Sequence, residues 1–143
     1  MQQTEEYYLR HAHQTLNTIR AMLIYGSNAK SDEAITDYKR LYAVTARTIS
    51  EQIRRQLGVS AEAVRDSAAQ RATYVHLRSL ILKRYGYGHC GDIAASGFID
   101  LVRKNVYPIE IVSTLEHDFL RLGYNPEQAN SGVLLDIWAN YVG

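Results

Sequence analysis

Apolar residues in the first 85 positions recur at spacings of three and four, the period of an amphipathic helix. On this pattern we expect helices over residues 3–25, 31–57 and 60–85. Gly26-Ser27-Asn28 and Gly58 separate them, since glycine and asparagine tolerate the backbone conformations that end a helix. No motif of known chemistry lies in this part, so we interpret it as packing support or as a surface for a partner.

The pattern changes at Gly86. Gly86 and Gly88 predict a tight turn. A fourth helix is expected over residues 90–104, with Asn105 ending it. The small residues Ala94-Ala95-Ser96-Gly97 on this helix would let a neighbouring element approach closely.

Beyond Pro108 the apolar period becomes two, and β-branched residues become frequent. We expect strands over 108–115, 117–122 and 132–136. The whole pattern predicts an α+β fold: a helical N-terminal part, then one more helix and a small antiparallel sheet. We divide the chain into a helical preface, 1–85, and a compact core, 86–143, integrated into a single domain, 1–143.

Composition narrows the class of protein. The chain has 143 residues, 46% of them hydrophobic, and a formal net charge of +1, which gives no reason to expect nucleic acid as a partner. Basic residues gather between Arg54 and Arg84, Arg78 among them, and we interpret them as a solvated helical face. We see no secretory signal peptide and no apolar run long enough to span a bilayer, and expect a soluble protein.

The chain contains one cysteine, Cys90, so it has no internal disulfide. Cys90 stands at the expected helix start, where unpaired N–H groups and a partial positive charge make a thiol easier to ionise. His117 and Asp136 follow on expected strands, 27 and 19 residues further along (117 − 90 and 136 − 117). A histidine can take the thiol proton and an aspartate can orient the histidine, so this order predicts a Cys-His-Asp triad.

Three short motifs carry a resemblance to a known family. They are Gly88-His89-Cys90-Gly91-Asp92-Ile93-Ala94, then Glu116-His117-Asp118-Phe119, then Asp136-Ile137-Trp138-Ala139. In this order they resemble the papain-like and transglutaminase-like cysteine effectors and toxins of bacteria, over residues 86–140. Ile137 stands where that family usually has proline.

The resemblance implies a papain-like or transglutaminase-like core and a thiol enzyme that acts on a protein amide as a protease, glutamine deamidase or transglutaminase. Cys90 would attack the carbonyl carbon, with His117 as base and then acid and Asp136 holding the imidazole. It also implies a protein substrate, such as a host protein, and export without a signal peptide into a target-cell cytosol. The backbone N–H of Cys90 is a natural oxyanion donor, and Gly88, Tyr87 and Trp138 are further candidates for positioning the substrate.

Other residues have simpler interpretations. His89 could be a rival base, although neighbours at a helix start point in different directions. Asp92 is expected to favour the helix N-terminus, and Asp118 to face outward from the sheet. His11 and His13, two apart on a helix, face different sides, so we expect no metal site, and nothing predicts a cofactor. The alternative function is a non-catalytic helical interaction module or secretion adaptor, or an inactive relative of the enzymes, with Cys90 structural.

Overall fold

In the computed structural model, the structure describes residues 3–23, 48, 52, 55, 68–86 and 88–143. The expected helix over 31–57 and the first part of the one over 60–85 lie almost wholly outside these residues. The described helices are α1 (Glu5–Met22), α4 (Ala68–Tyr85) and α5 (Cys90–Arg103). The described strands are β1 (Ile109–Ser113), β2 (Asp118–Leu122), β3 (Val133–Asp136) and β4 (Tyr141–Val142).

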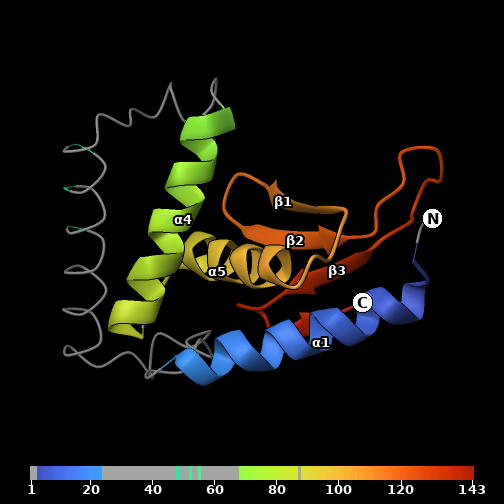
Figure 1. Ribbon diagram of the computed structural model, residues 1–143, viewed down its shortest axis with the longest axis horizontal. Helices are drawn as coiled ribbons and strands as arrows, with labels where there is room; N and C mark the ends of the chain where they lie inside the picture. Colours follow the sequence, from blue (N-terminus) through green and yellow to red (C-terminus); the bar gives the residue numbers. More distant parts are fainter. Residues whose placement is uncertain (1–2, 24–47, 49–51, 53–54, 56–67, 87) are drawn as a thin grey trace.

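The strands form one antiparallel sheet in the order β1-β2-β3-β4, so every strand pairs with its neighbour in the chain (Figure 1). The described chain is therefore α+β, as the sequence predicts. Two details differ from the prediction. Strand β2 begins at Asp118, which leaves His117 in the preceding turn, and β4 was not expected because two residues are too few to show an alternation.

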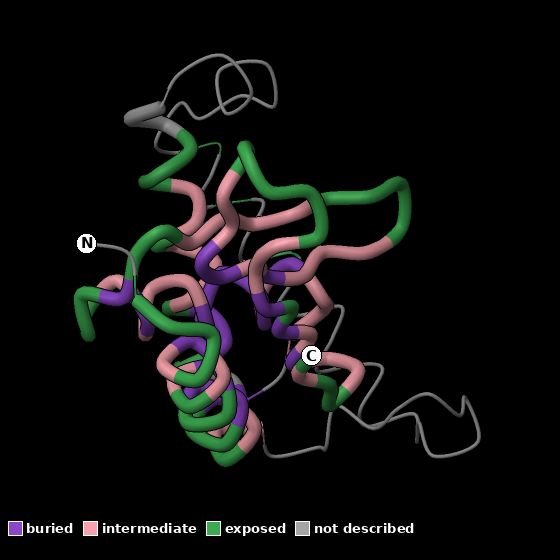
Figure 2. Tube along the Cα trace, turned by 90° about the vertical axis from the view of Figure 1, so that its right-hand side faces the viewer, coloured by how far each residue is buried: buried purple, intermediate pink, exposed green. Residues whose placement is uncertain are grey.

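Helices α1 and α5 cover one face of the sheet. Leu120 pairs with Leu135 and Leu122 with Val133, and all four side chains are buried on this face. Buried segments gather at the centre of the molecule, whereas the loop tips are exposed (Figure 2). The core therefore lies between the sheet and the two helices, and it fixes where the N-terminus of α5 stands relative to the ends of β2 and β3.

Helix α5 packs very closely on the sheet, as its small residues predict. A Cβ atom added at Gly97 would lie 2.6 Å from Ile137 Cδ1 and 2.9 Å from Leu120 Cδ1, closer than van der Waals contact allows. Past its end, Asn105 adopts a left-handed conformation (φ 57°). The N–H of Val106 donates to the carbonyl of Leu101 (3.1 Å), which closes the last turn.

Helix α1 forms hydrogen bonds to α5, to the residues just before β1 and to the residue just after β3. The hydroxyl of Thr15, fully buried, donates to Asp100 of α5 (2.6 Å). The hydroxyl of Tyr8 donates to the carbonyl of Tyr107 (2.8 Å), and Arg20 donates to the carbonyl of Ile137 (3.2 Å). No helix in the described part of the chain is long and apolar enough to cross a membrane.

His11 gives α1 a titratable group whose charged form is disfavoured by the fold. Its Nδ1 atom is buried without a hydrogen bond among the described residues, and its ring lies 4.5 Å from that of Tyr7. Burial, with Arg10 and Lys104 nearby, lowers the pKa of His11 below its ordinary value. The neutral imidazole is therefore the form that the fold favours.

The lowered pKa of His11 predicts that the folded protein loses stability in acid. Because the pKa of His11 is lower in the folded chain than in the unfolded one, its contribution is complete above about pH 6.5 and is lost as the pH falls through the folded value. We expect the melting temperature of His11→Phe to fall less than that of the wild type between pH 7.5 and pH 5. The matched control is His13→Phe, at an exposed position on the same helix, which should keep the wild-type dependence. Equal falls in all three proteins would contradict the assignment.

Candidate active site

Cys90 is the first residue of α5, as the sequence predicts, and a glycine-containing turn leads to it. Gly86 has a positive φ (64°), which ends α4, and its N–H donates to the carbonyl of Leu82 (2.8 Å). Gly88 packs so closely that an added Cβ would lie 2.8 Å from Asp92 Cβ and 3.0 Å from Leu82 Cδ1. Tyr87, a candidate positioning residue, lies outside the described residues. The turn therefore seats the helix start against the end of α4.

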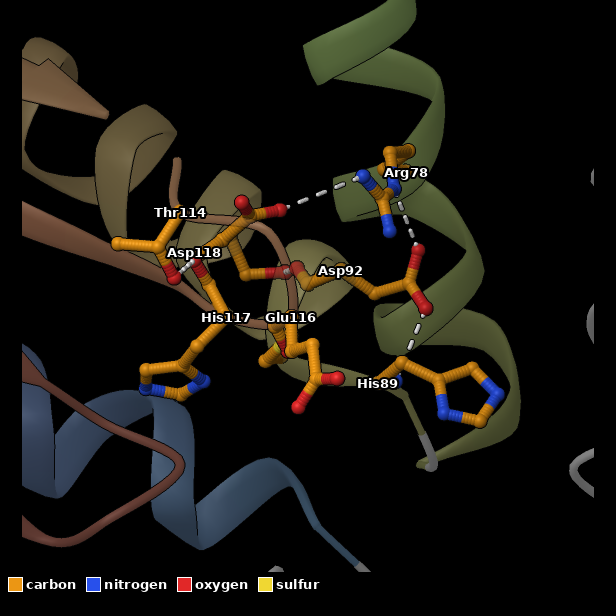
Figure 3. Close-up of polar contacts among 9 residues, drawn as sticks. Arg78, His89, Asp92, Thr114, Glu116, His117 and Asp118 are labelled. Atoms are coloured by element: carbon orange, nitrogen blue, oxygen red, sulfur yellow. Dashed lines mark hydrogen bonds and ion pairs between the residues drawn. The ribbon is translucent and has the colours of Figure 1, made fainter. Parts of the chain in front are cut away.

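Asp92 closes the first turn of α5. One of its carboxylate oxygens accepts the backbone N–H of His89, the N-cap residue (3.0 Å), and the other accepts Nε of Arg78 (2.8 Å; Figure 3). A carboxylate here also complements the positive end of the helix. Asp92 therefore lies in the first turn of α5, as expected, and also caps the helix.

The turn between β1 and β2 brings His117 to the same region. Ser113 pairs with Asp118, and the loop between them is closed by Thr114, whose N–H and hydroxyl both donate to the carbonyl of His117 (2.8 and 3.0 Å; Figure 3). The sulfur of Cys90, half-buried, lies 4.0 Å from the carbonyl oxygen of Glu116. The thiol thus contacts the residue immediately before His117.

His117 and Asp136 are in direct contact. His117 Nε2 lies 2.5 Å from Asp136 Oδ2, and both side chains are largely buried. The other oxygen, Oδ1, accepts the backbone N–H of Ala139 (3.1 Å), which holds the carboxylate at the end of β3. Since the carboxylate accepts at Nε2, Nδ1 is the nitrogen left to act on another group.

Two aromatic side chains flank the imidazole. The Trp138 ring lies 5.4 Å from the His117 ring in an edge-on arrangement, and the Phe119 ring lies 6.1 Å away, nearly parallel. Trp138 is half-buried, and its indole forms one wall of the histidine site. Such walls limit the access of water to the His-Asp pair and strengthen its electrostatic interaction.

The structure thus joins His117 and Asp136 directly and places Cys90 against Glu116, the residue before His117. Among the described residues no hydrogen bond links Cys90 to His117; the thiol contacts the Glu116 carbonyl instead. Hydrogen bonds of catalytic groups are often long before a substrate is bound. Gly88 and Trp138 also lie around this group, Gly88 at the turn before Cys90 and Trp138 at the imidazole.

Two interpretations from the sequence are wrong. Asp118 does not face outward: it shares the core face of β2 with Leu120 and Leu122, and its carboxylate lies 4.0 Å from Arg78 Nη1. Arg78 does not belong to a solvated helical face, because its side chain is 23% exposed and bonds to Asp92. The sequence indicates that Arg78 is partly buried, because it lies three residues after Val75 and four before Leu82, on the inward-facing side of α4.

A cavity of about 260 Å³ lies between α4, the start of α5 and the β1–β2 hairpin. Gly91 and Asp118, the residues that follow Cys90 and His117, both line it. Its apolar wall consists of Val75, Ala95 and Ile111. It is large enough for one amino-acid side chain.

Comparisons with known proteins give no family. No protein-family model, no curated protein and no solved structure matches this chain. The function must therefore be argued from the geometry of these residues.

Proposed function

We propose that this protein is a thiol enzyme that transfers the acyl group of a protein amide through Cys90, His117 and Asp136. One observation carries the proposal: a carboxylate-bound imidazole, His117 Nε2 to Asp136 Oδ2 at 2.5 Å, adjoins the residue whose carbonyl the Cys90 sulfur contacts. A thiol at a helix N-terminus beside an oriented imidazole is the arrangement that activates a cysteine nucleophile.

The proposed reaction proceeds in two steps. The Cys90 sulfur attacks the carbonyl carbon while its proton passes to His117 Nδ1, and the C–N bond breaks as His117 returns that proton to the leaving amine. The resulting thioester is cleaved by water or by an amine, whose proton His117 takes and returns to the sulfur. Asp136 keeps the imidazole in one tautomer and stabilises the imidazolium formed in each step.

The first turn of α5 supplies donors for the oxyanion. The first N–H groups of a helix have no partner within it, and those of Cys90 and Gly91 belong to this turn. A negative charge that develops next to the sulfur would be stabilised by these groups and by the helix dipole.

The papain-like or transglutaminase-like core remains part of the proposal. It is supported by the order of the elements: a helix that begins with the cysteine, then antiparallel strands flanked by the histidine and the aspartate. The resemblance of residues 86–140 to bacterial effectors and toxins further suggests a protein substrate in a target cell, reached without a signal peptide.

Variants of Asp136 test the role of the carboxylate. We expect Asp136→Ala to slow acylation of Cys90 by p-nitrophenyl acetate about 10²-fold, because the imidazole loses its orientation. Asp136→Asn should lose less, since an amide oxygen can still accept Nε2–H. Release of p-nitrophenol in stopped flow gives the rates. Equal rates in the wild type and both variants would exclude this role.

Incubation with a cell extract tests which group accepts the acyl group, water or an amine, and which class of substrate the protein uses. The wild type and Cys90→Ala are incubated with a cell extract in ¹⁸O-water, with and without a fluorescent primary amine. A Cys90-dependent gain of ¹⁸O at glutamine side chains indicates deamidation, a gain at new C-termini indicates proteolysis, and amine attachment indicates transamidation. Thiol reactivity that does not depend on His117, with no product in any of these assays, would favour the interaction module instead.

A further inference from the structure

Arg78 connects the helical preface to the proposed centre, and the proposed mechanism gives it no role. We propose that Arg78 is a positioning residue that fixes the turn before Cys90 and balances the carboxylates around the thiol. This rests on the proposed function. The inference concerns regulation of thiol reactivity by α4, through Arg78, which lies 12 residues before the cysteine (90 − 78).

The first contact acts on the nucleophile. Arg78 Nε donates to Asp92 Oδ1 (2.8 Å), and Asp92 Oδ2 accepts the N–H of His89 (3.0 Å). A single carboxylate thus joins the arginine to the residue immediately before Cys90. Loss of Arg78 would leave Asp92 with the N–H of His89 but without its hydrogen bond to α4.

The second contact acts on the base. Arg78 Nη1 lies 4.0 Å from Asp118 Oδ2, and Asp118 follows His117 at the start of β2 (Figure 3). The guanidinium therefore lies between Asp92, two residues after Cys90, and Asp118, one residue after His117. The three side chains are only 23%, 13% and 22% exposed for Arg78, Asp92 and Asp118, so these contacts are shielded from solvent.

Gly91 shows how closely the guanidinium fits. A Cβ atom at this position would overlap the terminal nitrogen atoms of Arg78. The terminal nitrogen atoms of Arg78 would have to shift to make room for this Cβ. Gly91→Ala is therefore a second way to displace the guanidinium without removing it.

The positive charge of Arg78 also favours formation of the Cys90 thiolate. The groups around the start of α5 are Arg71, Tyr74 and Arg78 from α4, His89 and Asp92 at the turn, and Glu116, His117, Asp118 and Asp136 from the sheet side. Burial acts to lower the pKa of Arg78, but the charge and hydrogen bond of Asp92 outweigh it, and the pKa of Arg78 is raised. Arg78 therefore stays charged and offsets carboxylates that would otherwise oppose a thiolate.

The test is the rate of Cys90 alkylation by iodoacetamide at pH 6.5 and at pH 9.5. In Arg78→Gln we expect the rate at pH 6.5 to fall about tenfold, because an uncompensated carboxylate disfavours the thiolate. At pH 9.5, where ordinary thiols are largely ionised, the rate should change less than about twofold. A purely structural loss would alter both rates together.

Three further variants sharpen the test. Gly91→Ala should reproduce the loss at pH 6.5, and Arg78→Gln combined with Asp92→Asn should recover most of the rate, because the unbalanced charge is then gone. Arg121→Gln is the matched control: it removes an arginine–carboxylate pair with Glu110 on the outer face of the sheet and should leave both rates unchanged. Thermal melts of each variant identify any that do not fold.

The outcomes separate this inference from the proposed function. If His117→Ala lowers the rate at pH 6.5 but Arg78→Gln and Gly91→Ala behave like Arg121→Gln, the positioning role is wrong and the thiol centre stands. If His117→Ala has no effect either, the proposed function fails. If Arg78→Gln does not fold, Gly91→Ala and Asp92→Asn decide the question with the guanidinium retained.

Discussion

Replacing His117 with alanine is expected to slow alkylation of Cys90 by iodoacetamide at pH 6.5 by about tenfold to a hundredfold. An ordinary thiol is only about 1% ionised at this pH, whereas a thiol that transfers its proton to an adjacent imidazole is ionised to a much larger extent. His117 is held by Asp136 (2.5 Å) and lies next to the residue that the sulfur contacts. The rate is measured by mass spectrometry of the intact protein.

His89→Ala is the matched control for this experiment. His89 directly precedes Cys90 and was the rival base. Its backbone N–H, which an alanine retains, makes the hydrogen bond to Asp92, and its side chain completes the capping box with the backbone of Asp92. We expect its rate to stay within about twofold of the wild type. A larger loss in His89→Ala than in His117→Ala would transfer the role of base to His89.

The second large effect is on stability. Gly97→Leu is expected to lower the free energy of unfolding by about 3 kcal/mol, because four carbon atoms would be forced against Ile137 and Leu120, which already lie within 3 Å of an ideal Cβ. Leucine is a better helix former than glycine, so intrinsic propensity acts in the opposite direction and any loss reports packing. Urea unfolding followed by circular dichroism gives the value.

Arg103→Leu introduces the same side chain at an exposed position of the same helix. It should change the free energy of unfolding by less than about 0.5 kcal/mol. Similar losses in the two variants would show that α5 does not pack on the sheet as closely as described.

The elements that the sequence predicts best are those with long, uniform periods. The change from a period of three and four to a period of two places α5 and the strands within a few residues of their observed bounds. Strand β4 could not be found, because a pair of residues has no period, and it is defined by the pairing of Val142 with Leu135. The helix over 31–57 stays a prediction.

For the candidate site, the residue types and their order were accessible from the sequence, but the contacts were not. Nothing in the spacing of His117 and Asp136 gives a distance of 2.5 Å, which depends on the β2–β3 register. Arg78 was misread because charge alone suggested solvent. Its burial depends on a partner, Asp92, that lies on a different helix.

The most direct test of the central claim is to search for an acyl-enzyme. The wild type, Cys90→Ala and His117→Ala are mixed with p-nitrophenyl acetate, quenched in acid and examined by mass spectrometry and peptide mapping. A Cys-His-Asp centre predicts a burst of p-nitrophenol, one acetyl group on Cys90 that is then released, and a loss of both in the variants. Acetylation of Cys90 no faster than that of free cysteine, and unchanged in His117→Ala, would contradict the claim.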